Sequence, residues 1–266
     1  MALRAAIDGR VTVAPRARAA RWAVAAMFLV NGALLANWVA RIPAVQQRLG
    51  LSAGALGIAL LGMAIGALAA FPVTGLLIAH YGSRRVTTGA ALVYCAAVPL
   101  PGLAPNLPLL MVALIALGAG NGAMDVAMNA QGVAVEARYG RPIMSSSHGL
   151  WSVGGFAGAL VGGAAAGAGI APFPHLLGAA AVLVIAALVA AHWLLPVVAD
   201  AHSGAPAFAR PTRALLGLGA VAFCSALGEG AMADWSAVYL HTSLAGPRPG
   251  RASRRSPICS ARRPCS

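Results

Sequence analysis

Acidic side chains inside long apolar segments are the residues of this 266-residue sequence most suited to chemistry. Three of the six acids occupy such positions: Asp125, Glu229 and Asp234. An ionised side chain at the centre of a bilayer costs about 2.5 to 3.5 kcal/mol or more, so it usually faces a cavity or a partner. These acids therefore predict a polar interior among apolar helices.

Amide and aromatic residues surround these acids at helical spacing. Asn121, Asp125 and Asn129 are four residues apart, which places them along one stripe of a helix. Three further pairs lie on the first and seventh apolar segments: Asn31 with Trp38, Asn37 with Arg41, and Trp235 with Tyr239. Because these groups occur at several depths, they predict a hydrophilic path rather than one isolated pair.

Structural interpretations of the same residues stay open. Asp125, Arg41 and Glu229 can instead cap helix ends or form pairs there. His148 follows three serines just before an apolar segment, and serines in that position most often cap a helix N-terminus. A functional role for His148 is the alternative. The other histidines, His175 among them, are expected at membrane interfaces, and Glu136 is expected in a cytoplasmic connection without a role.

The sequence carries no motif for hydrolysis, nucleotide binding or metal binding. A His-Glu-x-x-His pattern, a P-loop and a Gly-x-Ser-x-Gly elbow are all missing from it. We therefore expect no metal, no cofactor and no enzymatic activity. An intramembrane enzyme is the least supported alternative.

Composition indicates which elements must position these residues. Hydrophobic residues make up 59% of the chain and charged residues only 9%, against about 25% charged in an ordinary soluble domain. This excludes a soluble globular enzyme and predicts an all-α, polytopic membrane protein whose partner is the lipid bilayer. The net charge of +13 comes from arginines between apolar segments, without the aromatic interleaving of a nucleic-acid site, so we expect no nucleic-acid partner.

Seven membrane-spanning helices follow from the length of the apolar segments, because a bilayer core needs about 20 residues per helix. They are expected near 22–41, 53–79, 86–104, 107–131, 149–170, 174–197 and 214–241. Short connections predict that consecutive helices are antiparallel neighbours. Eleven arginines lie in the N-terminal segment and in the connections that follow the second, fourth and sixth helices. Only two lie in the connections that follow the odd-numbered helices, up to residue 241. The N-terminus is therefore expected in the cytoplasm.

Polar segments divide the chain into five parts. We expect a disordered cytoplasmic leader at 1–20, a six-helix half at 21–197, a central cytoplasmic loop at 198–213, a seventh helix at 214–241 and a basic tail at 242–266. Small residues also recur at four-residue spacing within the helices. They predict close packing between helix backbones and are Gly62, Gly66, Ala70, Gly118, Gly122, Gly154, Gly158 and Gly162.

The connection between the second and third helices resembles a known signature. Gly75, Gly82, Arg84 and Arg85 match the cytoplasmic motif Gly-x-x-x-Asp-Arg-x-Gly-x-Arg-Arg of the major facilitator superfamily. Ala79 stands where that motif has its aspartate, and His80 where it has its first arginine. The charge-based latch that this motif forms in the family is therefore not expected here.

Three other stretches are similar to one branch of that superfamily, the YbjJ-like bacterial permeases, which are distantly related to fucose permeases. They are Asn31-Gly32 with Arg41-Ile42-Pro43, the run 121–131, and the run Gly228-Glu229-Gly230-Ala231-Met232-Ala233-Asp234-Trp235. This resemblance implies the N-terminal six-helix half of a major-facilitator fold plus a seventh helix, in a bacterial inner membrane. It also implies a symporter that moves a small polar solute, driven by protons, through alternating access.

The resemblance also suggests roles for the polar residues. Asp125, Glu229 and Asp234 are the expected proton-coupling residues. The expected solute contacts are amides and aromatic plates, which suit a hydroxylated or zwitterionic solute: Asn31, Trp38, Asn121, Asn129 and Trp235. The alternative is a non-functional membrane fragment of such a transporter.

The last residues differ abruptly from everything before them. Residues 245–266 contain six arginines, four prolines, four serines and two cysteines. With the N-terminus inside, seven helices leave this segment outside, where six arginines oppose the positive-inside rule. A true basic tail is the alternative; we expect a frameshift near Leu244 to Pro247, whose lost reading frame encodes the rest of a second six-helix half.

Overall fold

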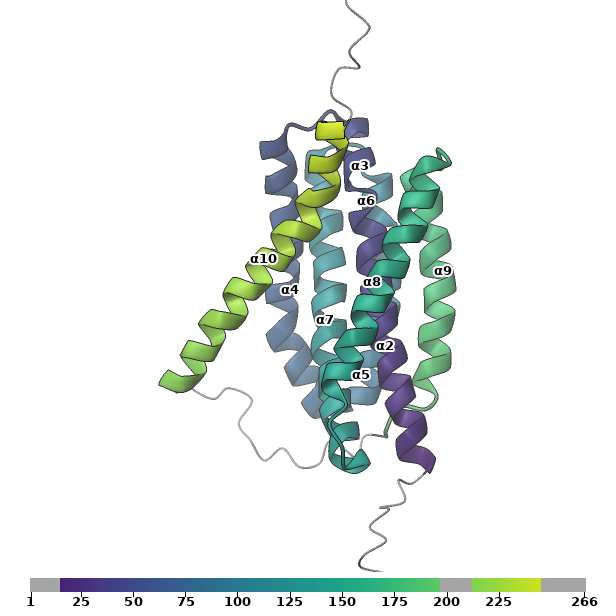
Figure 1. Cartoon of the computed structure of the whole chain (residues 1–266), viewed down its shortest axis with the longest axis vertical. Helices are drawn as coiled ribbons and strands as arrows, with labels where there is room; N and C mark the ends of the chain where they lie inside the picture. The colour runs from purple at the N-terminus through teal and green to yellow at the C-terminus, as the bar shows by residue number, and fades with distance from the viewer. Residues whose placement is uncertain (1–14, 197–211, 245–266) are drawn as a thin grey trace, which may run out of the picture.

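The structure, a computed structural model, describes residues 15–196 and 212–244, and in these ranges the regular structure is entirely helical. Figure 1 shows a bundle of long helices running between two ends, with α10 set apart from the rest. The helices are α2 (Pro15–Val39), α3 (Ile42–Leu49), α4 (Ala53–Tyr81), α5 (Ser83–Ala97), α6 (Leu100–Leu103), α7 (Leu107–Tyr139), α8 (Met144–Gly167), α9 (Pro172–Ala191) and α10 (Arg213–Leu244).

Seven of these helical segments are long and apolar enough to cross a membrane, which confirms the predicted fold class. Two bounds differ clearly from the prediction. The first helix begins at Pro15, so residues 15–20 of the predicted leader are helical. The fourth continues to Tyr139 and includes Glu136, which was expected in a connection. Residues 1–14, most of the central loop (197–211) and the tail beyond Leu244 lie outside the described residues.

Local signals set several helix ends. The side chain of Ser52 accepts a bond from the Ala55 amide at the start of α4, and Asn106 begins α7 in the same way. These bonds satisfy amides that have no partner within the helix. Gly50 and Gly140 end α3 and α7 in the left-handed conformation, with φ of 62° and 70°, which a residue without Cβ adopts at little cost.

Helix packing follows a different order from the chain. The closest pairs are α2 with α8 and α4 with α7, neither of which is consecutive in the chain. Among the consecutive spanning helices that the structure describes, α5 and α7 pack closely and the other pairs touch much less. The prediction that consecutive helices are neighbours therefore holds for α5 and α7 and is wrong for the other consecutive pairs. Short connections require consecutive helices to be antiparallel, but they leave the choice of packing partner to the faces of the helices.

Glycines determine those partners. A Cβ at Gly154 of α8 would overlap the Leu29 carbonyl of α2, and one at Gly158 would overlap that of Ala33. Between α4 and α7, a Cβ at Gly66 would overlap the Ile115 carbonyl, and one at Gly118 that of Met63. The absence of these side chains lets the backbones touch, so the predicted packing stripes are confirmed.

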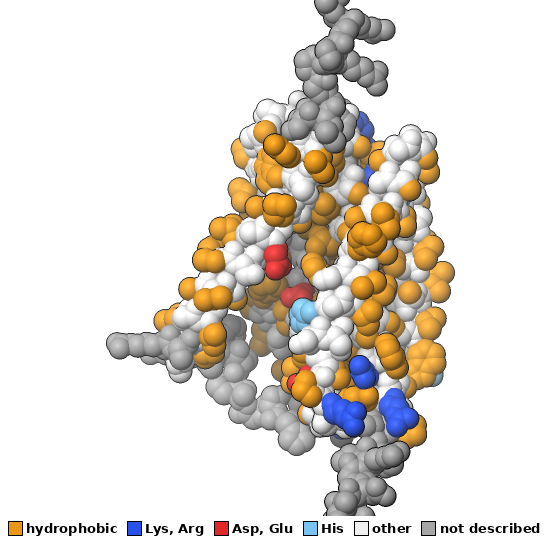
Figure 2. All heavy atoms as spheres, viewed as in Figure 1, with side chains coloured by type: hydrophobic (Ala, Val, Ile, Leu, Met, Phe, Trp, Pro, Cys, Tyr) orange, Lys and Arg blue, Asp and Glu red, His pale blue; other side chains and the backbone are white. Residues whose placement is uncertain are grey.

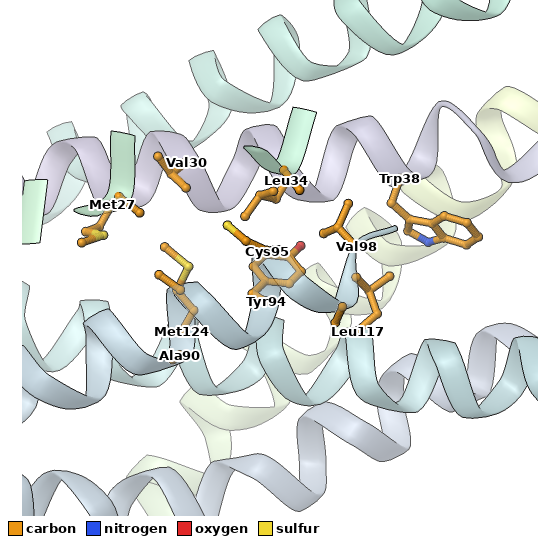
Figure 3. Close-up of a cluster of buried hydrophobic side chains, with 14 of the residues drawn as sticks. Met27, Val30, Leu34, Trp38, Ala90, Tyr94, Cys95, Val98, Leu117 and Met124 are labelled. Carbon is orange, nitrogen blue, oxygen red and sulfur yellow. The ribbon is translucent and has the colours of Figure 1, made fainter. Parts of the chain in front are cut away.

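A buried apolar cluster lies among α2, α5 and α7 (Figure 3). Met27 of α2 lies opposite Met124 of α7 there, Leu34 of α2 lies opposite Tyr94 of α5, and all four are fully buried. Trp38 belongs to this cluster and is only 1% exposed. The indole of Trp38 therefore contributes to the packing of the core.

Arginines of the described residues gather at one end of the bundle, the lower end in Figure 2, where α2 begins and α4 meets α5. The opposite end carries Arg41 and Arg48. Arg48 donates to the carbonyl oxygens of Gly102, Pro101 and Ala104, and Arg41 donates to that of Ile170. These two arginines thus hold together the connections at their own end of the bundle.

Helix α10 has little cover from the rest of the chain. It touches α2 and α3, and in Figure 1 it leans away from the bundle toward its N-terminal end. Its spanning segment Leu215–Leu240 has mean hydropathy 1.5, and Leu218, Val221 and Phe223 are more than 60% exposed. This surface suits acyl chains or further helices rather than water.

Candidate functional site

A cavity of about 190 Å³ opens between α10 and the bundle, at the middle of the helices. Figure 2 shows acidic side chains and a histidine facing the hollow beside α10. The cavity draws its lining from α2, α7, α8 and α10, and it combines four apolar or aromatic residues with five polar ones: Phe28, Leu35, Met128 and Trp151 with Asn31, Asn121, Asp125, His148 and Glu229.

Asn31 joins three helices at this cavity. Its side-chain nitrogen donates to Oδ1 of Asn121 on α7 at 3.2 Å. Its oxygen accepts from the indole nitrogen of Trp151 on α8 at 2.8 Å. Asn31 is 2% exposed, so both bonds lie away from lipid. A solute entering the cavity meets amides that are already fixed in orientation.

Asp125 is held from its own helix. The side-chain nitrogen of Asn129 donates to Oδ1 of Asp125 at 3.1 Å and to the Asp125 carbonyl oxygen at 2.9 Å. Asp125 is half-buried and lines the cavity, whereas Asn129 is not among the lining residues. Of the predicted stripe, Asn121 and Asp125 therefore line the cavity. Asn129 does not line it but orients the carboxylate of Asp125.

His148 of α8 lines the same cavity as Asp125. Its ring packs edge-on against Phe28, with centroids 4.9 Å apart, and its Nδ1 is 3.1 Å from the Met144 carbonyl oxygen. With Nδ1–H donating to that carbonyl, Nε2 is the nitrogen that can take up a proton. The structure thus adds a second titratable group beside Asp125.

The serines before His148 do not cap α8, so that prediction was wrong. Ser146 and Ser147 donate back to the Ile143 carbonyl. The carboxylate of Glu136 supplies the cap instead, because its Oε2 accepts from the amides of Ile143 and Met144 at 2.7 and 3.1 Å. Glu136 reaches these amides from the last turns of α7, seven residues earlier in the chain.

Glu229 completes the cavity from α10. Its side chain is largely exposed, and its Oε1 is 3.4 Å from the Ser225 hydroxyl group. Asp234 and Trp235, which follow on the same helix, are half-buried but do not line the cavity. Trp235 packs against the buried cluster and faces Gly57 of α4. Trp38 is also absent from the lining.

A second polar group is buried toward the opposite end from the arginine-rich one. His175 of α9 lies 3.0 Å, through Nε2, from Oδ1 of Asn37 on α2. His175 lies in the first turn of α9, and it is 8% exposed and Arg41 only 2%, so both side chains are buried among the helices. Nothing in the spacing of the sequence links these two helices. The group ties α2 to α9 and the α8–α9 connection.

Residues of the cytoplasmic loop motif lie at the other end of the bundle. Gly82 joins α4 to α5 with φ of 78°, a conformation that favours glycine. Arg84 donates to the His192 carbonyl oxygen at 3.1 Å, while Arg85 is exposed. Gly75 has open space around its Cα on α4. In the described part of the chain, no cluster of histidine, cysteine and acidic residues is suited to hold a metal.

Comparison with known proteins bears on this arrangement. The model of the Major Facilitator Superfamily matches residues 21–248. An uncharacterized transporter of Sinorhizobium fredii is 40% identical over 82% of this chain, and an uncharacterized MFS-type transporter of Yersinia pestis is 38% identical over 85%. The membrane protein MosC of Rhizobium meliloti is 35% identical over 82%. The chain covers 58%, 58% and 53% of these relatives, and thus little more than half their length.

Proposed function

The chain belongs to the Major Facilitator Superfamily, and from this we propose that it takes part in secondary active transport of a small polar solute. We assign it to the YbjJ-like branch of the family, on the motifs at Asn31, at 121–131 and at Gly228–Trp235. The driving ion is the proton, and the solute crosses by alternating access. The chain resides in a bacterial inner membrane with its N-terminus in the cytoplasm.

The observation that carries this proposal is the cavity at mid-depth. A buried amide network and two carboxylates line it within otherwise apolar helices. Polar and ionisable groups at that depth are costly, and transporters place their solute sites there. Asn31 and Asn121 supply both donors and acceptors, which suits hydroxyl or zwitterionic groups on the solute.

Asp125 is the proposed proton site. It is the half-buried carboxyl group of the cavity, and Asn129 keeps it oriented while His148 offers a neighbouring base. Binding of a proton removes a charge from the apolar interior, so protonation favours helix movements that close the cavity. Glu229 and Asp234 on α10 serve the same coupling as that helix moves toward the bundle.

Solute contacts change during the cycle. Asn31 and Asn121 contact the solute from α2 and α7 in the cavity, and we assign Asn129 to a later contact, after it releases Asp125. We assign Trp38 and Trp235 to another stage, in which the helices have moved and an indole plate covers the solute. Trp151, which the sequence alone did not single out, fixes Asn31 throughout.

The distribution of arginine supports the orientation. Seven arginines of the described helices and connections lie at the end where α2 begins: Arg16, Arg18, Arg21, Arg84, Arg85, Arg138 and Arg141. Cytoplasmic segments retain such residues. The two arginines of the other end are used in bonds to backbone carbonyls.

Proteoliposome uptake tests the proposal. The full chain and the Sinorhizobium fredii relative are reconstituted separately and given a panel of labelled sugars and amino acids, with and without an imposed pH gradient. We expect gradient-dependent uptake of at least one solute by both proteins. Asp125→Asn is expected to abolish the gradient dependence, and Glu136→Gln, which removes the same charge outside the cavity, to retain it.

Two results would count against the proposal. Uptake by the relative but not by this chain would favour a non-functional membrane fragment. Uptake whose pH dependence survives in the Asp125→Asn variant would remove Asp125 from the coupling site. Circular dichroism of the variants checks that they are folded. We expect unchanged helical content, because removing a buried charge lowers the cost of membrane insertion.

A further inference from the structure

A second cavity lies at the arginine-rich end of the bundle, between the first turns of α5 and the last turn of α9. Its volume is about 380 Å³, twice that of the central cavity. Residues from both helices line it: Arg84, Arg85, Thr88, Gly89, Leu188, Ala191 and His192. It is separate from the residues assigned to transport, so its role is independent of the proposed function.

Two guanidinium groups give this cavity a positive charge that its walls do not balance. No acidic residue is among the described side chains that line it. The family motif would bring an aspartate to this connection, but the residue there is Ala79. Arg84 donates to the His192 carbonyl oxygen at 3.1 Å, which fixes its side chain at the rim. Paired guanidinium groups bind phosphate oxygens well, because their donors match the geometry of that group.

One side of the cavity is apolar and open to the bilayer. A Cβ at Gly89 would have no atom within 4 Å, so α5 has a bare strip at this position. Leu92 and Val93 on α5 and Leu188 on α9 continue the strip and are 41–57% exposed. Trp193 is 49% exposed next to His192, and tryptophan is typical of the level of lipid headgroups. The charged and apolar parts therefore meet at the membrane interface.

We propose that this cavity binds the headgroup of an anionic phospholipid. The guanidinium groups of Arg84 and Arg85 hold the phosphate diester, and an acyl chain lies along the bare strip over Gly89. Free phosphate offers the same oxygens but leaves the apolar strip uncovered, so the lipid is the better match. In the bilayer, the lipid phosphate supplies the negative charge at the α4–α5 connection. In other members of the family, the aspartate of the motif supplies that charge.

Native mass spectrometry of the full chain in a neutral detergent measures this binding directly. Phosphatidylglycerol is titrated against phosphatidylcholine of the same acyl length. We expect phosphatidylglycerol to bind more tightly, and each of Arg84→Gln and Arg85→Gln to weaken it about fivefold. The control is the pair Arg138→Gln and Arg141→Gln, which removes exposed arginines from the same end without touching the cavity.

A space-filling variant separates the lipid from other sources of phosphate. Gly89→Leu keeps both arginines and has room on α5, but it covers the acyl strip. We expect it to weaken phosphatidylglycerol binding at least fivefold while leaving the helical content unchanged. Equal binding of the two lipids, or equal loss in the control pair, would overturn the proposal. Displacement of the lipid by millimolar inorganic phosphate, with Gly89→Leu silent, would assign the cavity to free phosphate instead.

Discussion

Replacing Gly154 with alanine is expected to force α2 and α8 apart. The new Cβ would overlap the Leu29 carbonyl oxygen and lie 2.8 Å from the carbonyl carbon and 3.0 Å from Cα of the same residue. Unstrained carbon contacts are about 3.5–4.0 Å, so α8 must retreat by roughly 1 Å. Because backbone atoms form this contact, no side-chain rotation relieves it.

Gly155, the next residue on α8, is the matched control. A Cβ there would have no atom within 4 Å. Both substitutions gain the same helix propensity, about 1 kcal/mol for glycine to alanine. The difference between the variants is therefore the overpacking cost, about 1–3 kcal/mol against Gly154→Ala.

Unfolding of the purified variants in mixed micelles, followed by circular dichroism, measures that difference. Gly155→Ala is expected to equal or exceed the parent chain in free energy of unfolding, and Gly154→Ala to fall below Gly155→Ala. Equal free energies of unfolding for the two variants would refute the assignment of this stripe to the α2–α8 contact.

Three other predictions concern helix ends and orientation. Asn106→Ala removes the side chain that caps α7 and is expected to lower the free energy of unfolding by about 1 kcal/mol, measured in the same micelles. Glu136→Ala removes the acceptor of two amides at the start of α8 and is expected to cost about 1–2 kcal/mol there; a silent substitution would refute this cap. In a chain whose own cysteines are replaced by alanine, Arg141→Cys is expected to react with a membrane-impermeant thiol reagent from the cytoplasmic side, and Ala171→Cys from the outer side. Labelling of both from one side would refute the topology.

Periodicity and length were enough to predict the helical fold, because each spanning helix needs its own run of apolar residues. They were also enough to place Asn121 and Asp125 on one face, since spacing by four is a property of the helix itself. Contacts between helices were not predictable in this way. Trp151 and His148 reach the cavity because α8, the fifth span, packs on α2, the first span. Likewise, Trp38 shares a face with Asn31 but belongs to the buried apolar cluster instead of the cavity lining.

The packing stripes and the polar site depend on the same helix contact. A Cβ at Gly32 of α2 would overlap the carbonyl oxygen of Trp151, the residue whose indole donates to Asn31. Gly32 directly follows Asn31, so the close approach that glycine permits also sets the 2.8 Å bond between Trp151 and Asn31. A larger residue at Gly32 would move α8 outward and lengthen this bond, although the polar side chains themselves would be unchanged. Glycine at this position therefore contributes to the geometry of the cavity, although it makes no polar contact through a side chain.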